Sequence, residues 1–287
     1  MSRTLSETWD FIVTSQVHLY HSIVKIYDSE GHSKLTILQA KQIVKTYGTK
    51  QTIQEVLRGI DLNIETGEFV SIMGPSGSGK TTLLNVLSSI DYLSQGSVIL
   101  NGKQLEKLSN KELSEIRKKD IGFIFQEYNL LHTLTVKENI MLPLSVLKLN
   151  KEEMNKRYRQ ITEALNIYDI SDKYPSEISG GQRQRTSAAR AFITYPKIIF
   201  ADEPTGALGS KNTRDLLTRF EKINKIYDVT IIMVTHDPLA ASFSNRVVML
   251  KDGLIFTEIY QGQDNKQLFY EEILRAQSIL GGKIYEF

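Results

Sequence analysis

A glycine-rich segment, which we term the phosphate loop, constrains this chain more than any other feature. It runs from Gly74 to Thr81 as Gly-Pro-Ser-Gly-Ser-Gly-Lys-Thr and matches the pattern G-x-x-x-x-G-K-[ST] at every fixed position. The apolar run 68–73 before it predicts a buried strand, and residues 82–87 after it predict the first turns of a helix. This context favours a phosphate site over a glycine-rich turn that matches by chance.

The residue types in the phosphate loop suit the binding of phosphate groups. Glycines let the backbone curl so that successive N–H groups point at phosphate oxygens, and the helix start adds the positive end of its dipole. We expect Lys80 to reach the β and γ phosphates and the Thr81 hydroxyl to bind Mg²⁺. The predicted nucleotide-binding residues here are Gly74, Ser76, Gly77, Ser78, Gly79, Lys80 and Thr81 of the phosphate loop, and Thr82 directly after it.

Composition bounds the kind of protein. The chain has 287 residues, enough for one large domain or two small ones, and its net charge of +2 is too balanced for a nucleic-acid surface. It has no cysteine, which excludes disulfides, thiolate chemistry and cysteine metal sites and agrees with a cytosolic protein. No apolar run is long enough to span a bilayer, and the N-terminus lacks the pattern of a secretory signal. Any membrane role is therefore expected to run through a partner.

Residues 1–34 are expected to form an N-terminal extension, with one domain over residues 35–287. Apolar residues recur in the extension at three- and four-residue steps, from Trp9 to Tyr27, so an amphipathic helix is possible. Such a helix would dock on a partner or a membrane surface. The alternative is a dispensable tail, or a start assigned too far upstream, and we favour this because the polar side lacks the Lys and Arg of a membrane-lying helix.

From Leu35 onward the pattern predicts an α/β fold. Residues 35–45 and 55–64 alternate apolar with polar residues, as half-buried antiparallel strands do. Later apolar runs alternate with helical segments, which indicates parallel βαβ units with helices on both faces. The predicted strands are 98–100, 121–125, 198–201, 230–235 and 247–250, and the predicted helices are 111–118, 151–165, 182–193 and 210–226.

Two carboxylates end the apolar run 197–201. A carboxylate at the carboxyl end of a parallel strand faces the crevice where ligands bind. Asp202 suits the coordination of Mg²⁺, directly or through water, and Glu203 suits the polarisation of an attacking water. Alone, the pattern equally describes a strand capped by solvated acids, but the phosphate loop favours the functional interpretation.

A second small-residue turn, the signature segment Ser179–Gln182, precedes another helical segment. Its glycines, Gly180 and Gly181, form a potential nest for anions, and Ser179 adds a hydroxyl donor. The alternative is an ordinary helix start capped by Ser179. One ATP can contact both this segment and the phosphate loop only if the second anion-binding segment comes from another subunit or another face.

Three further residues follow predicted strands. Gln126 is expected to sense Mg²⁺ or water, His236 to contact the γ-phosphate, and Tyr47 to stack on adenine. Taken singly, each is more often structural, since a histidine caps helices and a tyrosine packs. Their common placement after strands favours a functional role. The residues expected to act in catalysis are Lys80, Glu203 and His236, and those expected to hold the metal are Thr81, Gln126 and Asp202.

The motifs together resemble those of the ATP-binding-cassette (ABC) ATPases. The phosphate loop, Gln126, the signature segment, Asp202-Glu203 and His236 occur in that family's order, over about residues 36–287. Finer features are similar to the MacB/lipoprotein-release branch, and within it to the bacitracin-type peptide-antibiotic resistance transporters. The segments that carry this finer resemblance are 71–85, 123–131, 135–139, 186–188, 201–207 and 279–282.

This resemblance implies the P-loop NTPase fold of ABC ATPases, with a RecA-like parallel core sheet, an antiparallel β subdomain and a helical subdomain at about residues 127–180. It also implies a head-to-tail homodimer with two ATP molecules at the interface, so that each phosphate loop faces the other chain's signature segment. An integral membrane permease is expected against the Gln126–Pro143 region, on the cytoplasmic face of the membrane, with no nucleic-acid partner. The implied activity is ATP hydrolysis that drives the permease.

One position departs from the family pattern. Gly209 stands where the family usually has Asp, in a loop that crosses the dimer interface. We expect slower or less coupled hydrolysis, with dimerisation retained. The alternatives to a transporter ATPase are a soluble cassette acting on nucleic acid or ribosomes, which the single phosphate loop and near-neutral charge disfavour, and a regulatory module that holds ATP without turnover.

Overall fold

The computed structural model describes residues 35–48 and 52–281. The extension at residues 1–34, with the helix considered for it, lies outside the described residues, as does Gly282 of the C-terminal motif. The chain divides into two compact units, Met1–Leu35 and Thr36–Phe287, and the strands and helices of the described residues lie in the second unit.

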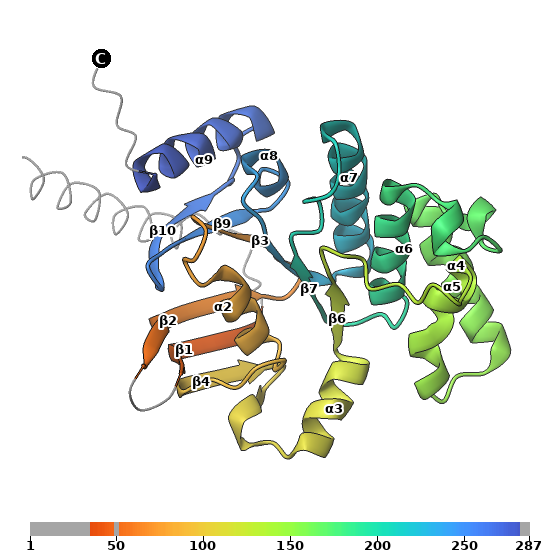
Figure 1. The fold of residues 1–287 in the computed structure, drawn as a ribbon, viewed down its shortest axis with the longest axis horizontal. Helices are drawn as coiled ribbons and strands as arrows, with labels where there is room; N and C mark the ends of the chain where they lie inside the picture. The colour runs from red at the N-terminus through yellow and green to blue at the C-terminus, as the bar shows by residue number, and fades with distance from the viewer. Residues whose placement is uncertain (1–34, 49–51, 282–287) are drawn as a thin grey trace, which may run out of the picture. The chain divides into compact units, whose positions relative to one another are not determined.

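Two sheets organise the second unit (Figure 1). The first has the order β2-β1-β4-β5 and pairs antiparallel, and its strands are β1 (Thr36–Tyr47), β2 (Gln54–Glu65), β4 (Gln95–Leu100) and β5 (Lys103–Gln104). The second has the order β10-β9-β3-β8-β7-β6 and is parallel except for the β9–β10 hairpin. Its strands are β3 (Phe69–Met73), β6 (Ile121–Ile124), β7 (Ile198–Asp202), β8 (Thr230–Val234), β9 (Arg246–Lys251) and β10 (Leu254–Tyr260).

The helix that follows the phosphate loop, α2 (Lys80–Leu87), is buried where the two sheets meet. Its Leu83, Leu84, Val86 and Leu87 belong to one apolar cluster, the central core, with side chains from β1, β2 and β4 and from β3, β7 and β8 of the parallel sheet. Helix α3 (Asn110–Lys119) adds Leu113 and Ile116 to it. The central core therefore fixes the helix that carries Lys80 and Thr81.

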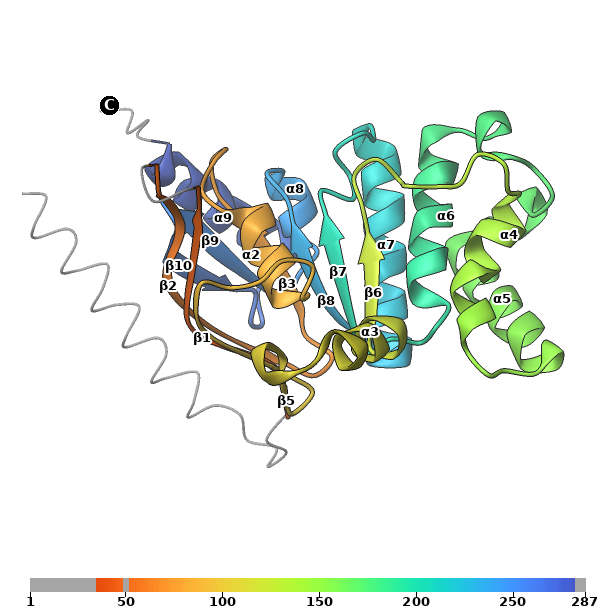
Figure 2. The ribbon, with the colours of Figure 1, turned by 60° about the horizontal axis from the view of Figure 1, so that its bottom comes forward.

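The opposite face of the parallel sheet is covered by helices. A second cluster, the helical core, joins Ile199 and Ala201 of β7 to apolar side chains of α4 (Val136–Met141), α5 (Lys151–Leu165), α6 (Gly180–Phe192) and α7 (Ser210–Tyr227). In both views α4 and α5 lie beyond α6, away from the sheet (Figure 2). Short 3₁₀ segments, η2 (Leu142–Val146), η3 (Tyr168–Ile170) and η4 (Pro175–Glu177), connect them, and η1 (Leu105–Lys107) follows β5.

A smaller cluster closes the far edge of the parallel sheet. Helices α8 (Pro238–Ala241) and α9 (Lys266–Leu280) pack there against Met73, Val247 and Met249. Among the residues that the structure describes, no helix combines the length and apolar character needed to cross a membrane.

From Leu35 onward the predicted strands and helices are all present, with boundaries shifted by a few residues. Buried strands agree best, because β3 and β8 are buried at every position. Helix starts follow their capping residues: Ser109 and Thr135 each accept a hydrogen bond from the backbone N–H three residues later. The Glu112 and Glu138 carboxylates in turn accept hydrogen bonds from the backbone N–H groups of Ser109 and Thr135. The expected α/β fold with one parallel and one antiparallel sheet is confirmed.

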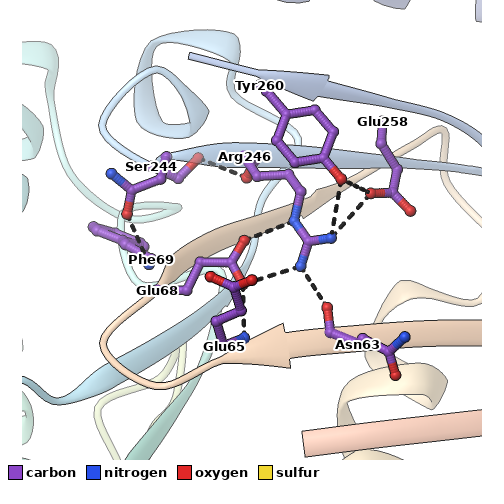
Figure 3. A network of polar contacts seen from close by, with 9 residues as sticks. Asn63, Glu65, Glu68, Phe69, Ser244, Arg246, Glu258 and Tyr260 are labelled. Carbon is purple, nitrogen blue, oxygen red and sulfur yellow. Dashed lines mark hydrogen bonds and ion pairs between the residues drawn. The ribbon is translucent and has the colours of Figure 1, made fainter. Parts of the chain in front are cut away.

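A buried arginine ties four segments together near the amino end of β3 (Figure 3). Arg246 of β9 pairs through Nε with Glu68 at 2.7 Å and through a terminal nitrogen with Glu258 of β10 at 3.0 Å. It also donates to the Asn63 carbonyl of β2 at 2.7 Å. Burial opposes the charge of Arg246, but Glu68 and Glu258 outweigh burial and raise its pKa. For the neighbouring Tyr260 burial acts in the other direction and raises the pKa to about 12.

Candidate functional site

The phosphate loop joins β3 to α2 through glycines that no other residue can replace without strain. Gly74 has φ of 154°, and a Cβ there would lie 2.2 Å from the Leu250 carbonyl oxygen. Gly79, the residue before α2, has φ of 97°, and its Cβ would lie 2.9 Å from the Leu57 side chain. Ser76 and Gly77 are exposed on the loop, whereas Ser78 is buried beneath it. The backbone therefore curls as the sequence predicted.

Lys80 folds back over this loop. Its Nζ donates to the carbonyl oxygens of Gly74 at 2.9 Å and Pro75 at 2.8 Å. Partial burial lowers the pKa of Lys80, while Glu203 and Asp202 act in the opposite direction. The Lys80 ammonium group is thus held against the loop, close enough to Glu203 and Asp202 for both carboxylates to influence its pKa.

Thr81 and Asp202 meet across the parallel sheet. The Thr81 hydroxyl donates to Asp202 Oδ1 at 3.2 Å, which brings the start of α2 to the end of β7. Burial raises the pKa of Asp202, and Glu203 adds to this, whereas Thr81 and Lys80 oppose it. Hydroxyl and carboxylate oxygens are hard donors of the kind that Mg²⁺ prefers, so this pair fits that ion. Within the described ranges, no group of three or more His, Cys, Asp or Glu side chains is arranged to hold a metal by itself.

Glu203 and His236 form a contact that sequence reasoning missed. His236 Nδ1 lies 2.9 Å from both carboxylate oxygens of Glu203, within hydrogen-bond distance of each. Glu203 adopts a left-handed backbone conformation with φ of 47°, and its N–H donates to the Val234 carbonyl. The Glu203 side chain is 15% exposed and the His236 side chain 69%. Strain at a non-glycine residue of this kind clusters at functional sites.

Gln126 and Tyr47 lie near other residues of this site but at the ends of strands in different sheets. Gln126 follows β6, and its Nε2 would lie 3.2 Å from a Cβ built at Gly206, in the turn after Glu203. Tyr47 ends β1, and its hydroxyl donates to Asp91 at 2.7 Å. The Thr82 hydroxyl lies close enough to Tyr47 to influence the pKa of the phenol, which places this ring beside the first turn of α2.

The signature segment begins α6 as a capping box. Gln182 N–H donates to the Ser179 hydroxyl at 3.3 Å, and Ser179 N–H donates to the Gln182 side chain at 2.8 Å. The local alternative of a capped helix start is therefore present in the structure, and it leaves Gly180 and Gly181 in the first turn. Helix α6 belongs to the helical core and α2 to the central core, so the two anion-binding devices start from opposite faces of the parallel sheet.

The predicted residues therefore divide into two groups. Lys80, Thr81, Asp202, Glu203 and His236 come together because they follow three neighbouring strands, β3, β8 and β7, at one edge of the sheet. The signature segment forms the second group, because within one copy of the chain it starts from the other face of the parallel sheet. Asp91 and Lys45, which contact Tyr47, were not predicted, because nothing in their local sequence marks them.

Comparison with known proteins identifies the family of this chain. A family model described as ABC transporter matches residues 57–206. The bacitracin export ATP-binding protein BceA of Halalkalibacterium halodurans is 58% identical over 248 residues, covering 86% of this chain and 98% of BceA. The ABC transporter ATP-binding protein YxdL of Bacillus subtilis is 48% identical over 246 residues, covering 86% of this chain and 95% of YxdL.

Solved structures lead to the same fold. A dimeric post-hydrolysis state of the ATP-binding cassette MJ0796, bound to ADP and Pi, has a TM-score of 0.72 at 39% identity and covers 78% of this chain and 98% of its own. MJ0796 comes from Methanocaldococcus jannaschii. The cbiO1 protein from Clostridium perfringens has a TM-score of 0.74 at 26% identity, covering 85% and 95% of the two chains. A family match that includes the phosphate loop and Asp202, with 58% identity over most of the chain, shows that this protein belongs to the ABC transporter family.

Proposed function

We propose that two copies of this chain bind and hydrolyse two molecules of MgATP and thereby drive a membrane permease. The observation that carries the proposal is the meeting of Lys80, Thr81, Asp202, Glu203 and His236 at one edge of the parallel sheet. Mg²⁺ would be held by Thr81 and Asp202, with Gln126 nearby, and would supply charge neutralisation on the phosphates. Glu203 would orient the attacking water.

The roles of the other site residues follow from their positions. Backbone N–H groups of the phosphate loop and the Lys80 ammonium bind the phosphate oxygens, and Tyr47 stacks on adenine. His236 holds the Glu203 carboxylate through Nδ1 and leaves Nε2 free to face the γ-phosphate. Each residue thus binds, orients or stabilises charge on the transferred phosphoryl group.

The dimer follows from the separation of the two anion-binding devices. Since the phosphate loop and the signature segment start from opposite faces of the sheet, a second copy turned head to tail supplies the missing half. The solved cassette MJ0796, 39% identical, is dimeric. Residues 35–287 would then form the ATPase domain, with a helical subdomain at about 127–180 and an extension at 1–34.

A groove beside Gln126 is the proposed permease contact. It has a volume of about 280 Å³, and its lining includes Phe123, Phe125, Pro143 and Val146, with Arg117, Lys118 and Arg190 among the polar residues. A lining that contains both apolar and cationic side chains suits a helix that carries aromatic and acidic residues. The name of BceA, bacitracin export ATP-binding protein, supports a peptide-antibiotic resistance role. The protein would then act at the cytoplasmic face of the membrane.

Phosphate release and cell fractionation together test this function. The purified protein is expected to release phosphate from ATP with Mg²⁺ and to stop when EDTA removes the ion, because chelation leaves the phosphate charge unneutralised. A membrane-bound pool is expected only when the permease from a neighbouring gene is co-produced. ATP binding without any turnover would instead indicate a regulatory module, and turnover without a membrane pool would indicate a soluble ATPase.

Gly209 yields a separate prediction about the dimer. It is the N-cap of α7, with φ of −73°, no side-chain cap, and open space where a Cβ would lie. Gly209→Asp is therefore expected to stabilise α7 by a few tenths of a kcal/mol, since Asp caps helices well. We also expect it to raise ATP turnover by roughly threefold or more, because a carboxylate returns to the interface loop.

The matched control is Gly209→Asn, which caps the helix without adding charge. It should raise the melting temperature as Asp does, yet leave the turnover per dimer near that of the wild type. If Gly209→Asp also left turnover unchanged, the glycine would have no part in coupling the two sites.

A further inference from the structure

The aromatic ring proposed to bind adenine is held by two residues from different segments. Asp91 Oδ2 accepts a hydrogen bond from the Tyr47 hydroxyl at 2.7 Å, and Asp91 Oδ1 accepts one from Lys45 Nζ at 2.7 Å. The same ammonium lies 4.6 Å from the centroid of the Tyr47 ring. The Asp91 carboxylate thus contacts the hydroxyl at the edge of this tyrosine, and the Lys45 ammonium lies over one face of its ring.

Lys45 is shielded from solvent, whereas the Asp91 side chain is 29% exposed and the ring is accessible. Lys45 is 8% exposed, and its Nζ also donates to the Tyr92 carbonyl at 2.6 Å, while Tyr47 is 42% exposed. Burial opposes ionisation of Asp91, but its hydrogen bonds from Lys45 and Tyr47 outweigh burial and lower its pKa. The lowered pKa keeps the Asp91 carboxylate ionised at neutral pH. An ammonium group over a ring face is stabilised by the π electrons.

Asp91 connects this ring to the phosphate-binding helix. The N–H groups of Ile90 and Asp91 both donate to the Asn85 carbonyl of α2, at 2.9 and 3.1 Å. Helix α2 starts with Lys80 and Thr81, so one short rigid segment links the phosphate site to the carboxylate that fixes the tyrosine. The distance from ring to phosphate loop is thereby set by covalent structure and by these hydrogen bonds.

We propose that Asp91 and Lys45 are positioning residues for nucleotide binding, which orient Tyr47 so that its uncovered face receives the adenine base. The inference rests on the proposed function, since it needs Tyr47 to stack on a base. Lys45 covers one ring face, so the base is directed to the other. A ring already fixed loses little conformational entropy when it stacks, and this lowers the KM for ATP. The phosphoryl transfer step, which Asp91 does not contact, is unaffected.

The test compares Asp91→Ala and Tyr47→Phe with the wild type in Mg²⁺-dependent phosphate release. Each variant is expected to raise the KM for ATP by roughly threefold to tenfold, with kcat within about twofold, because only the orientation of the ring is lost. The double variant should raise KM no further than the larger single effect, since both changes remove the same hydrogen bond from the Tyr47 hydroxyl to Asp91. Tyr47→Phe keeps the ring and the Lys45–Asp91 ion pair, so it still tests the effect of the hydrogen bond on KM if Asp91→Ala folds poorly.

A ligand without a base separates positioning from general damage. Inorganic tripolyphosphate contacts only the phosphate-binding residues, so its inhibition constant against ATP should be unchanged in both variants. Tyr168→Phe, at a tyrosine that is 46% exposed in η3, is the matched control and should leave KM unchanged. Equal weakening of tripolyphosphate and ATP would overturn the positioning role.

Tyr47→Ala distinguishes failure of this inference from failure of the proposed function. If Tyr47→Ala raises KM while Asp91→Ala and Tyr47→Phe do not, the tyrosine stacks but is not positioned by Asp91, and only the inference is wrong. If Tyr47→Ala leaves KM unchanged, the base does not bind this ring, and the stacking assignment falls together with the inference.

Discussion

Replacing Glu203 by glutamine is expected to lower phosphate release by about a hundredfold to ten-thousandfold, because an amide neither accepts a proton nor polarises water as a carboxylate does. Glutamine has nearly the same volume and still accepts a hydrogen bond from His236, so the left-handed backbone and the contact at 2.9 Å should persist. ATP binding should therefore be retained. The measurements are phosphate release and the dissociation constant for ATP.

Glu127→Gln supplies the control for this variant. Glu127 is exposed in the loop after β6, so the same chemical change at this position should leave turnover near that of the wild type. A Glu203→Gln protein that hydrolyses ATP at the wild-type rate would falsify the role given to this carboxylate and would move the search to Asp202.

Replacing Arg246 by methionine is expected to lower the free energy of unfolding by about 3–5 kcal/mol, the usual cost of removing one partner from a buried ion pair. Arg246 is 7% exposed, and its loss leaves the Glu68 and Glu258 carboxylates, which are 14% and 18% exposed, without their cation. The Asn63 carbonyl also loses its donor. Urea unfolding followed by circular dichroism measures the change.

A surface arginine offers the comparison. Arg159 pairs with Glu163 at 2.8 Å, but its side chain is 70% exposed, so Arg159→Met should cost at most about 1 kcal/mol. Adding Glu68→Gln and Glu258→Gln to Arg246→Met should restore part of the lost stability, since neutral side chains need no cation. Equal costs for Arg246→Met and Arg159→Met would show that the buried network adds nothing.

The sequence predicted the parts of the site that depend on local pattern. A glycine-rich loop after a fully buried strand can be recognised in the sequence because it depends only on neighbouring residues. Gly74 and Gly79 adopt the positive φ angles that this pattern requires. Asp202 and Glu203 were placed correctly for the same reason, since an apolar run that ends in carboxylates has one natural location in a parallel sheet.

The contacts between distant residues were not predictable in this way. His236 and Glu203 lie 33 positions apart, and Tyr47 and Asp91 lie 44 positions apart. Such pairs form only when strand order and register are set, because many carboxylates compete for each partner on sequence grounds alone. The placement of Tyr47 and His236 after predicted strands suggested their roles, but the residues that contact them came from the structure.

Strand β7 has a consequence for which substitutions the protein tolerates. Its Ile198 and Phe200 belong to the central core, whereas Ile199 and Ala201 belong to the helical core, and all four are fully buried. Because Asp202 ends this strand and Glu203 follows it, a change of volume on either side re-aims both carboxylates. Mutational sensitivity of catalysis should therefore extend well away from the nucleotide, to aliphatic positions whose only visible task is to fill space.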